Sequence, residues 1–167
     1  MYKRQHIDQI SRHEQLLSEL SSALNVFINE METLGLLDRI LIVTTSEFGR
    51  RVYENGSDGT DHGTSAPLFI FGSNINSGIY GIDPDFNQFD ENDNPLVQFD
   101  YRQIYTSIIT DWFGLNQSVA NQIFGENFNK ISFVNTNMSS GNYINPRHIE
   151  IQAPYPNPFN NSITLDY

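Results

Sequence analysis

The chain contains no cysteine, which excludes disulfides, thiolate metal sites and thiol nucleophiles. Basic residues are also scarce, with 9 Lys and Arg against 20 Asp and Glu, so the formal net charge is −11. Because such a field repels phosphate groups, neither nucleic acid nor an anionic membrane surface is an expected partner. No apolar run approaches the roughly 18–20 residues that span a bilayer, so we expect no transmembrane segment.

Apolar residues make up 38% of the 167 residues and aromatic residues 13%, which is enough for the core of a domain of ordinary size. An acidic protein can still act on anionic substrates when bound metal ions reverse the local charge. Without cysteine, any transition metal has to be held by His, Asp or Glu.

Residues 1–5 do not begin a signal peptide, because no apolar stretch follows them. We interpret them as non-native, since Tyr-Lys-Arg-Gln is also what the end of a common transposon sequencing adaptor encodes. A genuine start at Met1 is the alternative. Under the first interpretation the protein continues upstream, and its domain is truncated at the N-terminus.

Residues 12–35 carry the clearest helical pattern. Ser11 with Glu14 three residues later predicts a capping box at the start, and Gly35 predicts the end. One apolar stripe recurs at three- and four-residue steps and consists of Leu16, Leu17, Leu20, Leu24, Phe27, Met31 and Leu34.

Residues 40–45 form a continuous apolar run, which is typical of a strand buried on both faces in a parallel sheet. A second run covers residues 67–71, further helices are predicted at 100–113 and 117–124, and a short strand is predicted at 131–133. A helix followed by a buried strand predicts an α/β fold, with a mostly parallel sheet flanked by helices.

Side chains that bind divalent metals lie near the ends of these strands. Glu47 comes directly after the first strand, while Asp61 and His62 come shortly before the second, and His6 precedes the long helix. In open α/β sheets such loops converge at the carboxyl ends of the strands. The sequence therefore predicts a metal site formed by His6, Glu47, Asp61 and His62.

Each of these residues also has a plainer interpretation. His6 would be a solvated side chain, Asp61 a turn residue, and Glu47 an ion-pair partner of Arg50 or Arg51. The oxygen-rich segment 55–59 is either a turn or part of a calcium loop. The acidic stretch 83–93 is interpreted as a solvated loop, because it lacks the ligand order of an EF-hand.

Several motifs resemble one bacterial family. They are Ser-Glu-Phe-Gly-Arg at 46–50, Thr-Asp-His-Gly at 60–63 and the segment 6–17. The family is domain of unknown function 1501, within the alkaline phosphatase–sulfatase superfamily. Residues 100–105 resemble its closing segment, and the resemblance covers about residues 6–134. It implies a partial alkaline-phosphatase-like fold.

The resemblance also implies a two-metal site around a Ser or Thr nucleophile, which would lie upstream of this chain. His6 and His62 match two of the metal-binding histidines. Arg4 stands where the family usually has an Asp, and Phe48 stands after Glu47 where an Asp-His pair is usual. The second metal is therefore in doubt, and Glu47 either binds it or acts on a water.

The implied cofactor is a divalent metal, zinc first, with calcium, magnesium and manganese as alternatives. The implied activity of the full-length protein is hydrolysis of a phosphate or sulfate ester, on a small molecule or a polymer, with Arg50 or alternatively Arg51 contacting the anion. The fragment itself should be inactive. The alternative is a non-catalytic secreted or cell-surface binding protein that retains the superfamily fold, which the change at Phe48 favours.

The tail resembles the start of the C-terminal sorting domain of type IX secretion substrates, on the strength of residues 153–160 and 162–165. This implies export by the type IX machinery and a secreted or cell-surface location. The sequence therefore predicts adaptor-derived residues 1–5, an alkaline-phosphatase-like domain at 6–134, a linker at 135–149 and a truncated β-sandwich sorting domain at 150–167.

Overall fold

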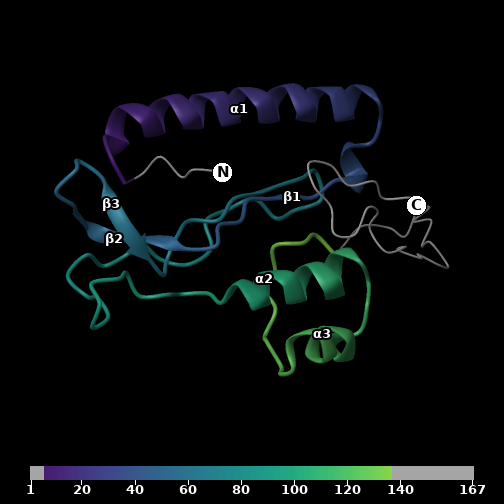
Figure 1. The fold of residues 1–167 in the computed structure, drawn as a ribbon. Coiled ribbons are helices and arrows are strands. Elements are labelled where there is room, and N and C mark those ends of the chain that lie inside the picture. Colours follow the sequence, from purple (N-terminus) through teal and green to yellow (C-terminus); the bar gives the residue numbers. More distant parts are fainter. Residues whose placement is uncertain (1–5, 137–167) are drawn as a thin grey trace, which may run out of the picture. The chain divides into compact units, whose positions relative to one another are not determined.

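Residues 6–136 are the part of the chain that the computed structural model describes. The predicted adaptor residues 1–5 and sorting segment 150–167 lie outside this part, as does nearly all of the linker 135–149. In chain order the elements are α1 (Gln9–Thr33), η1 (Leu37–Arg39), β1 (Ile42–Val43), β2 (Gly49–Glu54), β3 (Thr60–Gly63), β4 (Ile70–Phe71), α2 (Tyr101–Ser107), the π-helix η2 (Ile108–Trp112) and α3 (Gln117–Phe124) (Figure 1).

Helix α1 begins earlier than its sequence pattern predicts. Ser11 lies inside the helix, so the capping box predicted there was wrong. The actual start is fixed by the backbone, because the amides of Asp8 and Gln9 donate to the carbonyls of Ser57 and Asp58 at 3.0 and 2.8 Å. Gly35 does follow the end of the helix, in the left-handed conformation at φ 68°.

The strands form antiparallel pairs, so the predicted parallel sheet was wrong. Within the described residues there are two sheets of two strands each, β1 with β4 and β2 with β3. Val43 is the partner of Ile70, and Arg50 is the partner of His62. The expected alkaline-phosphatase-like α/β fold is therefore contradicted.

The physical reason lies in the connections. A parallel pair needs a crossover, usually a helix, whereas a short turn reverses the chain and gives an antiparallel pair. The segment between β1 and β4 holds the β2–β3 hairpin and no helix, so the chain returns against its own direction. The apolar run 40–45 indicates burial correctly but says nothing about the direction of the partner strand.

The core of the described part is small and lies near its end. Ile131, Phe133 and Val134 are buried, at 9%, 2% and 3% exposure. The residues that pack against them come from the segments at β1 and β4 and from α2 with η2, and are Leu41, Ile70, Ile75, Ile104, Ile108 and Trp112. The strand predicted at 131–133 is not formed; Val134 makes only an isolated bridge with Ile75.

The helices predicted at 100–113 and 117–124 are confirmed as α2 with η2 and as α3. A capping box starts α2: the Asp100 side chain accepts from the backbone, and the Asp100 amide donates to Gln103 Oε1 at 3.0 Å. The helix then widens to a π-turn, in which the Phe113 amide donates to the Ile108 carbonyl at 2.9 Å.

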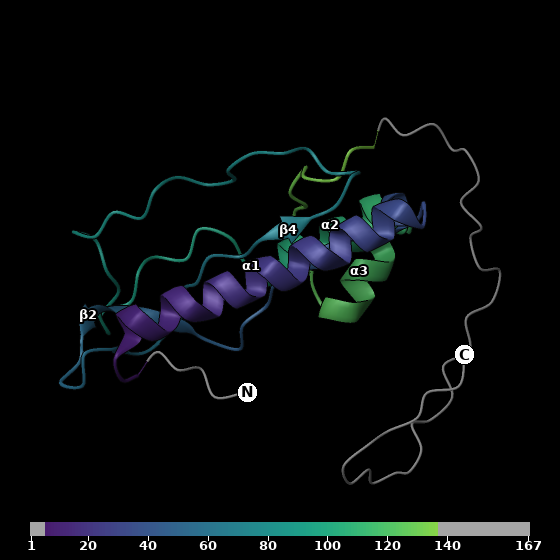
Figure 2. The same ribbon diagram turned by 90° about the horizontal axis from the view of Figure 1, so that it is seen from above.

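Figures 1 and 2 both show α1 as a single unbroken helix that starts beside the β2–β3 hairpin, and η1 follows its end in the chain. Within residues 6–136, none of the helices combines the length and the apolar character that crossing a bilayer requires. This finding agrees with the sequence expectation for the same residues.

Candidate functional site

The β2–β3 hairpin positions most of the predicted site residues. Its strands approach closely because glycine occupies two paired positions, Gly49 and Gly63. A Cβ atom on Gly49 would lie 1.8 Å from the Ser65 carbonyl oxygen, and one on Gly63 would lie 2.5 Å from the Arg50 carbonyl carbon. Any larger residue would therefore force the strands apart.

Asn55 holds the turn of the hairpin. Its side-chain oxygen accepts from the backbone amides of Ser57 and Gly59 at 2.9 and 3.2 Å. The backbone amide of Asn55 donates to the Gly59 carbonyl at 2.8 Å. The segment 55–59 is thus a turn, the first of the two interpretations of its sequence. The Asn55 side-chain nitrogen donates to the His6 carbonyl and to Asp61 Oδ1, both at 3.1 Å.

Three of the four predicted metal ligands come together beside this turn. His6 Nδ1 lies 3.5 Å from Asp61 Oδ1. The centroids of the His6 and His62 rings are 4.6 Å apart, with the rings inclined by 38°. We call these three residues the histidine cluster; it joins the segment before α1 to strand β3.

The histidine cluster is open to solvent. The side chains of His6 and Asp61 are 47% and 55% exposed, and His62 is exposed as well. Water therefore reaches all three side chains, and a small ligand needs no opening motion to reach them. The ring of Phe48 covers part of His62, with the two centroids 3.7 Å apart.

Arg50 supplies positive charge next to the cluster. Its Nη1 donates to the Thr60 carbonyl at 2.6 Å, and its guanidinium carbon lies 5.5 Å from the centroid of Phe48. Burial lowers the pKa of Arg50, and the negative charge of Asp61 opposes that shift. Because arginine is not deprotonated in proteins, the guanidinium places a positive charge near the exposed Asp61 carboxylate.

The fourth predicted ligand, Glu47, is not brought to the cluster. It is exposed in the turn before β2, where the Ser46 hydroxyl donates to the Phe48 carbonyl at 2.6 Å. Within residues 6–136, no group of three His, Asp or Glu side chains has the arrangement needed to hold a metal ion as it stands.

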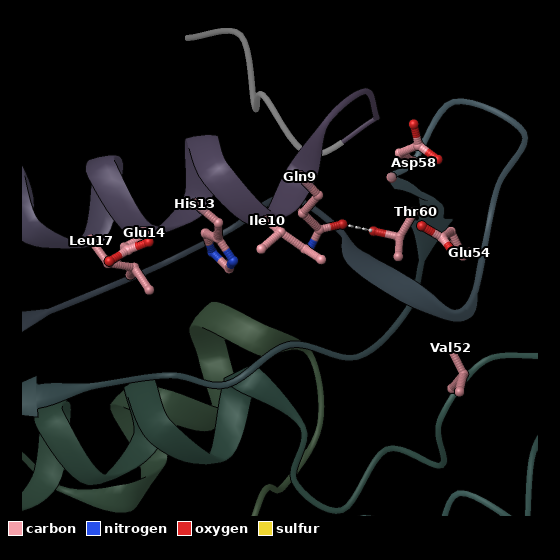
Figure 3. A pocket seen from close by; sticks show the side chains of 10 residues that line it. Gln9, Ile10, His13, Glu14, Leu17, Val52, Glu54, Asp58 and Thr60 are labelled. Carbon is pink, nitrogen blue, oxygen red and sulfur yellow. Dashed lines mark hydrogen bonds between the residues drawn. The ribbon is translucent and has the colours of Figure 1, made fainter.

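A shallow groove of about 510 Å³ runs between the start of α1 and the hairpin (Figure 3). Its lining combines carboxylates with apolar side chains: Gln9, Ile10, His13, Glu14, Leu17, Val52, Glu54, Asp58, Gly59 and Thr60. The Thr60 hydroxyl donates to Gln9 Oε1 at 2.7 Å, a bond that Figure 3 marks. The sequence does not predict this contact between Gln9 and Thr60, because no periodic pattern links residues 51 positions apart.

Residues 5–123 match the family model described as "Protein of unknown function (DUF1501)". The match confirms the family that the motifs in the chain resemble. That description assigns no activity, metal or substrate. No curated protein and no solved structure matches the chain.

Proposed function

We infer that this chain, which belongs to the DUF1501 family of proteins of unknown function, binds a divalent metal ion through His6, Asp61 and His62. One observation carries the inference: His6 lies against Asp61 and His62 although more than 50 residues separate them in sequence. Two imidazoles and a carboxylate are a common ligand set for zinc, and zinc is the ion we propose.

Two distances lie near those of a tetrahedral site, although the side chains would have to rotate to bring all three donor atoms onto one ion. With Zn–N bonds of about 2.0–2.1 Å, two ligand atoms of a tetrahedral zinc lie roughly 3.3 Å apart. The 3.5 Å between His6 Nδ1 and Asp61 Oδ1 is close to that value. With the same bond length, the centroids of two imidazoles on one tetrahedral zinc lie roughly 5.2 Å apart, somewhat more than the 4.6 Å between His6 and His62.

Asn55 supports the same assignment from outside the cluster. It bonds both the Asp61 carboxylate and the His6 backbone, so it fixes the two segments relative to one another. Groups that hold metal ligands in this way raise metal affinity by roughly 10–100-fold.

We further propose that the full-length protein hydrolyses phosphate or sulfate esters, as the resemblance to the alkaline phosphatase–sulfatase superfamily implies. A zinc ion supplies a Lewis acid for such a reaction. Arg50 would hold the anionic group of the substrate through its guanidinium. Glu47 stays a prediction as a ligand or base, because none of its described contacts reaches the cluster.

A specific observation favours a second function, metal-stabilised binding without catalysis. Phe48 occupies the position where a second metal ligand is usual, and its ring stacks on His62 instead. The protein would then be a secreted or cell-surface binding protein in which one ion fixes the hairpin to the segment before α1. Hydrolysis of aryl phosphates or sulfates by the full-length protein separates the two functions.

Export by the type IX machinery is part of the proposal and depends on residues 153–160 and 162–165, outside the described residues. The test is the location of the full-length protein in a bacterium that has this machinery. We expect the full-length protein in the medium or on the cell surface. After deletion of the tail from residue 150 onward, we expect the protein to be retained in the periplasm. Unchanged export after the deletion would remove the sorting assignment.

Metal binding is tested by titrating the metal-free chain with Zn²⁺ in a calorimeter. We expect one ion per chain at about micromolar affinity or tighter, and a loss of roughly 10-fold or more in His6→Ala, Asp61→Asn and His62→Ala. His13→Ala is the matched control, because His13 lies on α1 outside the cluster.

Circular dichroism of each variant shows whether the helices persist. If wild type binds no Zn²⁺, or if His62→Ala and His13→Ala bind equally well, the cluster is not a metal site. Calcium, magnesium and manganese titrations then complete the comparison of candidate ions.

A further inference from the structure

The groove between α1 and the β2–β3 hairpin has the size of a ligand site. Its volume of about 510 Å³ lies within the roughly 300–1,000 Å³ of sites that hold small molecules. The start of α1 forms one wall and the hairpin forms the other (Figure 3). The apolar part of the lining consists of Ile10, Leu17 and Val52, and Leu17 is 49% exposed. The groove therefore offers an aliphatic chain an apolar surface that is open to solvent.

Three carboxylates surround this apolar lining. Glu14 comes from α1, Glu54 from the end of β2 and Asp58 from the turn of the hairpin. Within residues 6–136, no Lys or Arg forms a salt bridge with any of the three. The start of α1 carries only about half an elementary positive charge, which does not balance three carboxylates. The groove therefore attracts a cation, and an aliphatic chain that ends in an ammonium group matches both parts of its lining.

The groove and the histidine cluster lie along one face of the hairpin. His62 and Thr60 are two positions apart on β3, so their side chains point to the same face. The segment at the start of α1 lies over both residues. His6 contacts His62 with ring centroids 4.6 Å apart, and Gln9 accepts a hydrogen bond from Thr60 at 2.7 Å. Glu54 is the register partner of Thr60, so it extends the same face into the groove.

We propose that this groove binds the alcohol part of the ester substrate, and that this part carries an alkylammonium group. The inference rests on the proposed function, in which the histidine cluster with its zinc ion and Arg50 hold the phosphate or sulfate group. The substrate is then a zwitterionic ester. Strand geometry places its two charges roughly 7–12 Å apart, so a linker of several carbon atoms separates them.

Calorimetric titration of the zinc-loaded chain tests the groove with a matched pair of ligands. Aminohexyl phosphate carries the ammonium group, and hexyl phosphate has the same chain without it. We expect aminohexyl phosphate to bind roughly 5-fold more tightly or better, because several exposed ion pairs each contribute a small factor. This ratio should fall at about 1 M salt, where charges are screened within about 3 Å. Equal affinity for the two ligands at low salt would overturn the proposal.

Two variants locate the ammonium group. Glu14→Gln and Glu54→Gln should each reduce the affinity ratio of the two phosphates by roughly 2- to 5-fold. Glu32→Gln is the matched control, because it removes an exposed carboxylate of the same helix outside the groove, and it should keep the ratio. An equal loss in Glu32→Gln would assign the preference to the net charge of the chain and not to the groove.

Titration of the metal-free chain with hexylamine separates this inference from the proposed function. We expect hexylamine to bind, and Glu54→Gln to weaken it while Glu32→Gln does not. If the chain binds Zn²⁺ but shows no preference for aminohexyl phosphate, the groove inference fails and the metal site stands. If it binds hexylamine but no Zn²⁺, the proposed function fails, and the groove is no longer part of an ester site.

Discussion

The ring of Phe48 stacks on the imidazole of His62, with centroids 3.7 Å apart and an angle of 24° between the rings. The contact joins the residue before β2 to a residue of β3, and Arg50 lies over the same phenyl ring. It restricts the orientation of His62, because the imidazole cannot rotate without leaving the phenyl face. Phe48 is therefore a positioning residue for the histidine cluster.

Phe48→Leu should weaken Zn²⁺ binding by roughly 2- to 10-fold, because an aromatic pair contributes about 0.5–1.5 kcal/mol beyond its buried area. Phe48→Tyr keeps the ring and should bind like wild type. Calorimetric titration provides the measurement, with Phe86→Leu in the exposed acidic loop as a control. Equal affinity of Phe48→Leu and wild type would show that the stacking does not position His62.

Gly63→Ala should disrupt the hairpin, because the added methyl would lie 2.5 Å from the Arg50 carbonyl carbon. We expect a fall in the free energy of unfolding of more than about 1 kcal/mol and a loss of Zn²⁺ binding. Gly56→Ala is the control, since a Cβ there meets nothing within 4 Å. Urea unfolding of both variants gives the comparison, and equal stability would show that the strands can separate without loss.

Ser107 and Thr106 are adjacent, fully buried residues of α2 with different hydrogen bonding. The Ser107 hydroxyl donates to the Gln103 carbonyl at 2.8 Å and accepts from the Ile131 amide at 2.7 Å. Ser107→Ala leaves that amide without a partner and should lower the free energy of unfolding by about 1–3 kcal/mol.

Thr106→Val is the matched comparison, because the Thr106 hydroxyl has no hydrogen-bond partner in the described part of the chain. Replacing this hydroxyl by a methyl group should be neutral or stabilising. Denaturant midpoints with an unchanged m-value measure both effects. A Thr106→Val loss as large as that of Ser107→Ala would contradict the assignment of the Ile131 bond as the source of stability.

Asp100 makes the stability of α2 depend on pH. Its hydrogen bonds from Arg102, at 2.9 Å to Nε and 2.6 Å to Nη2, lower the pKa of the carboxyl below its usual value. A carboxylate whose pKa is lower in the folded state stabilises the fold above its unfolded pKa of about 3.9. This contribution is lost as the pH falls below that value and through the folded pKa.

Asp100→Ser separates the charge of this residue from its role as a cap, because Ser also caps helices. The variant should keep α2 but show a weaker dependence of unfolding free energy on pH between about 5 and 2. Asp100→Ala loses both roles, so its free energy of unfolding should be lower than that of Asp100→Ser by about 0.5–2 kcal/mol. The same pH slope in wild type and Asp100→Ser would exclude the carboxylate as the titrating group.

Helices were the most predictable part of this molecule, because their spacing is local. The stripes in 12–35 and 100–113 and the short segment 117–124 gave α1, α2 with η2, and α3. The start of α1 escaped prediction, since the carbonyls of Ser57 and Asp58 fix it from a distant turn. Strand direction escaped prediction as well, because an apolar run has no information on the sense of its partner.

The candidate site was partly predictable. His6, Asp61 and His62 were named as metal ligands from their residue types and motifs, and the structure brings them together. Glu47 was grouped with them through the rule for parallel sheets, and it does not join them in an antiparallel hairpin. The stacking of Phe48 on His62 depends on the pairing of Gly49 with Gly63, which no local pattern reveals.

The attachment of α1 at both ends has a mechanical consequence. Its first residues are bonded to the turn of the hairpin, and its last turn runs into η1 and then β1. Because a helix is stiff along its axis, a tilt at the first turn of α1 displaces its last turn, roughly 37 Å away. A movement of the hairpin on binding an ion at His6 would therefore shift the position of η1. From η1 the chain enters β1, which leads back to the same hairpin.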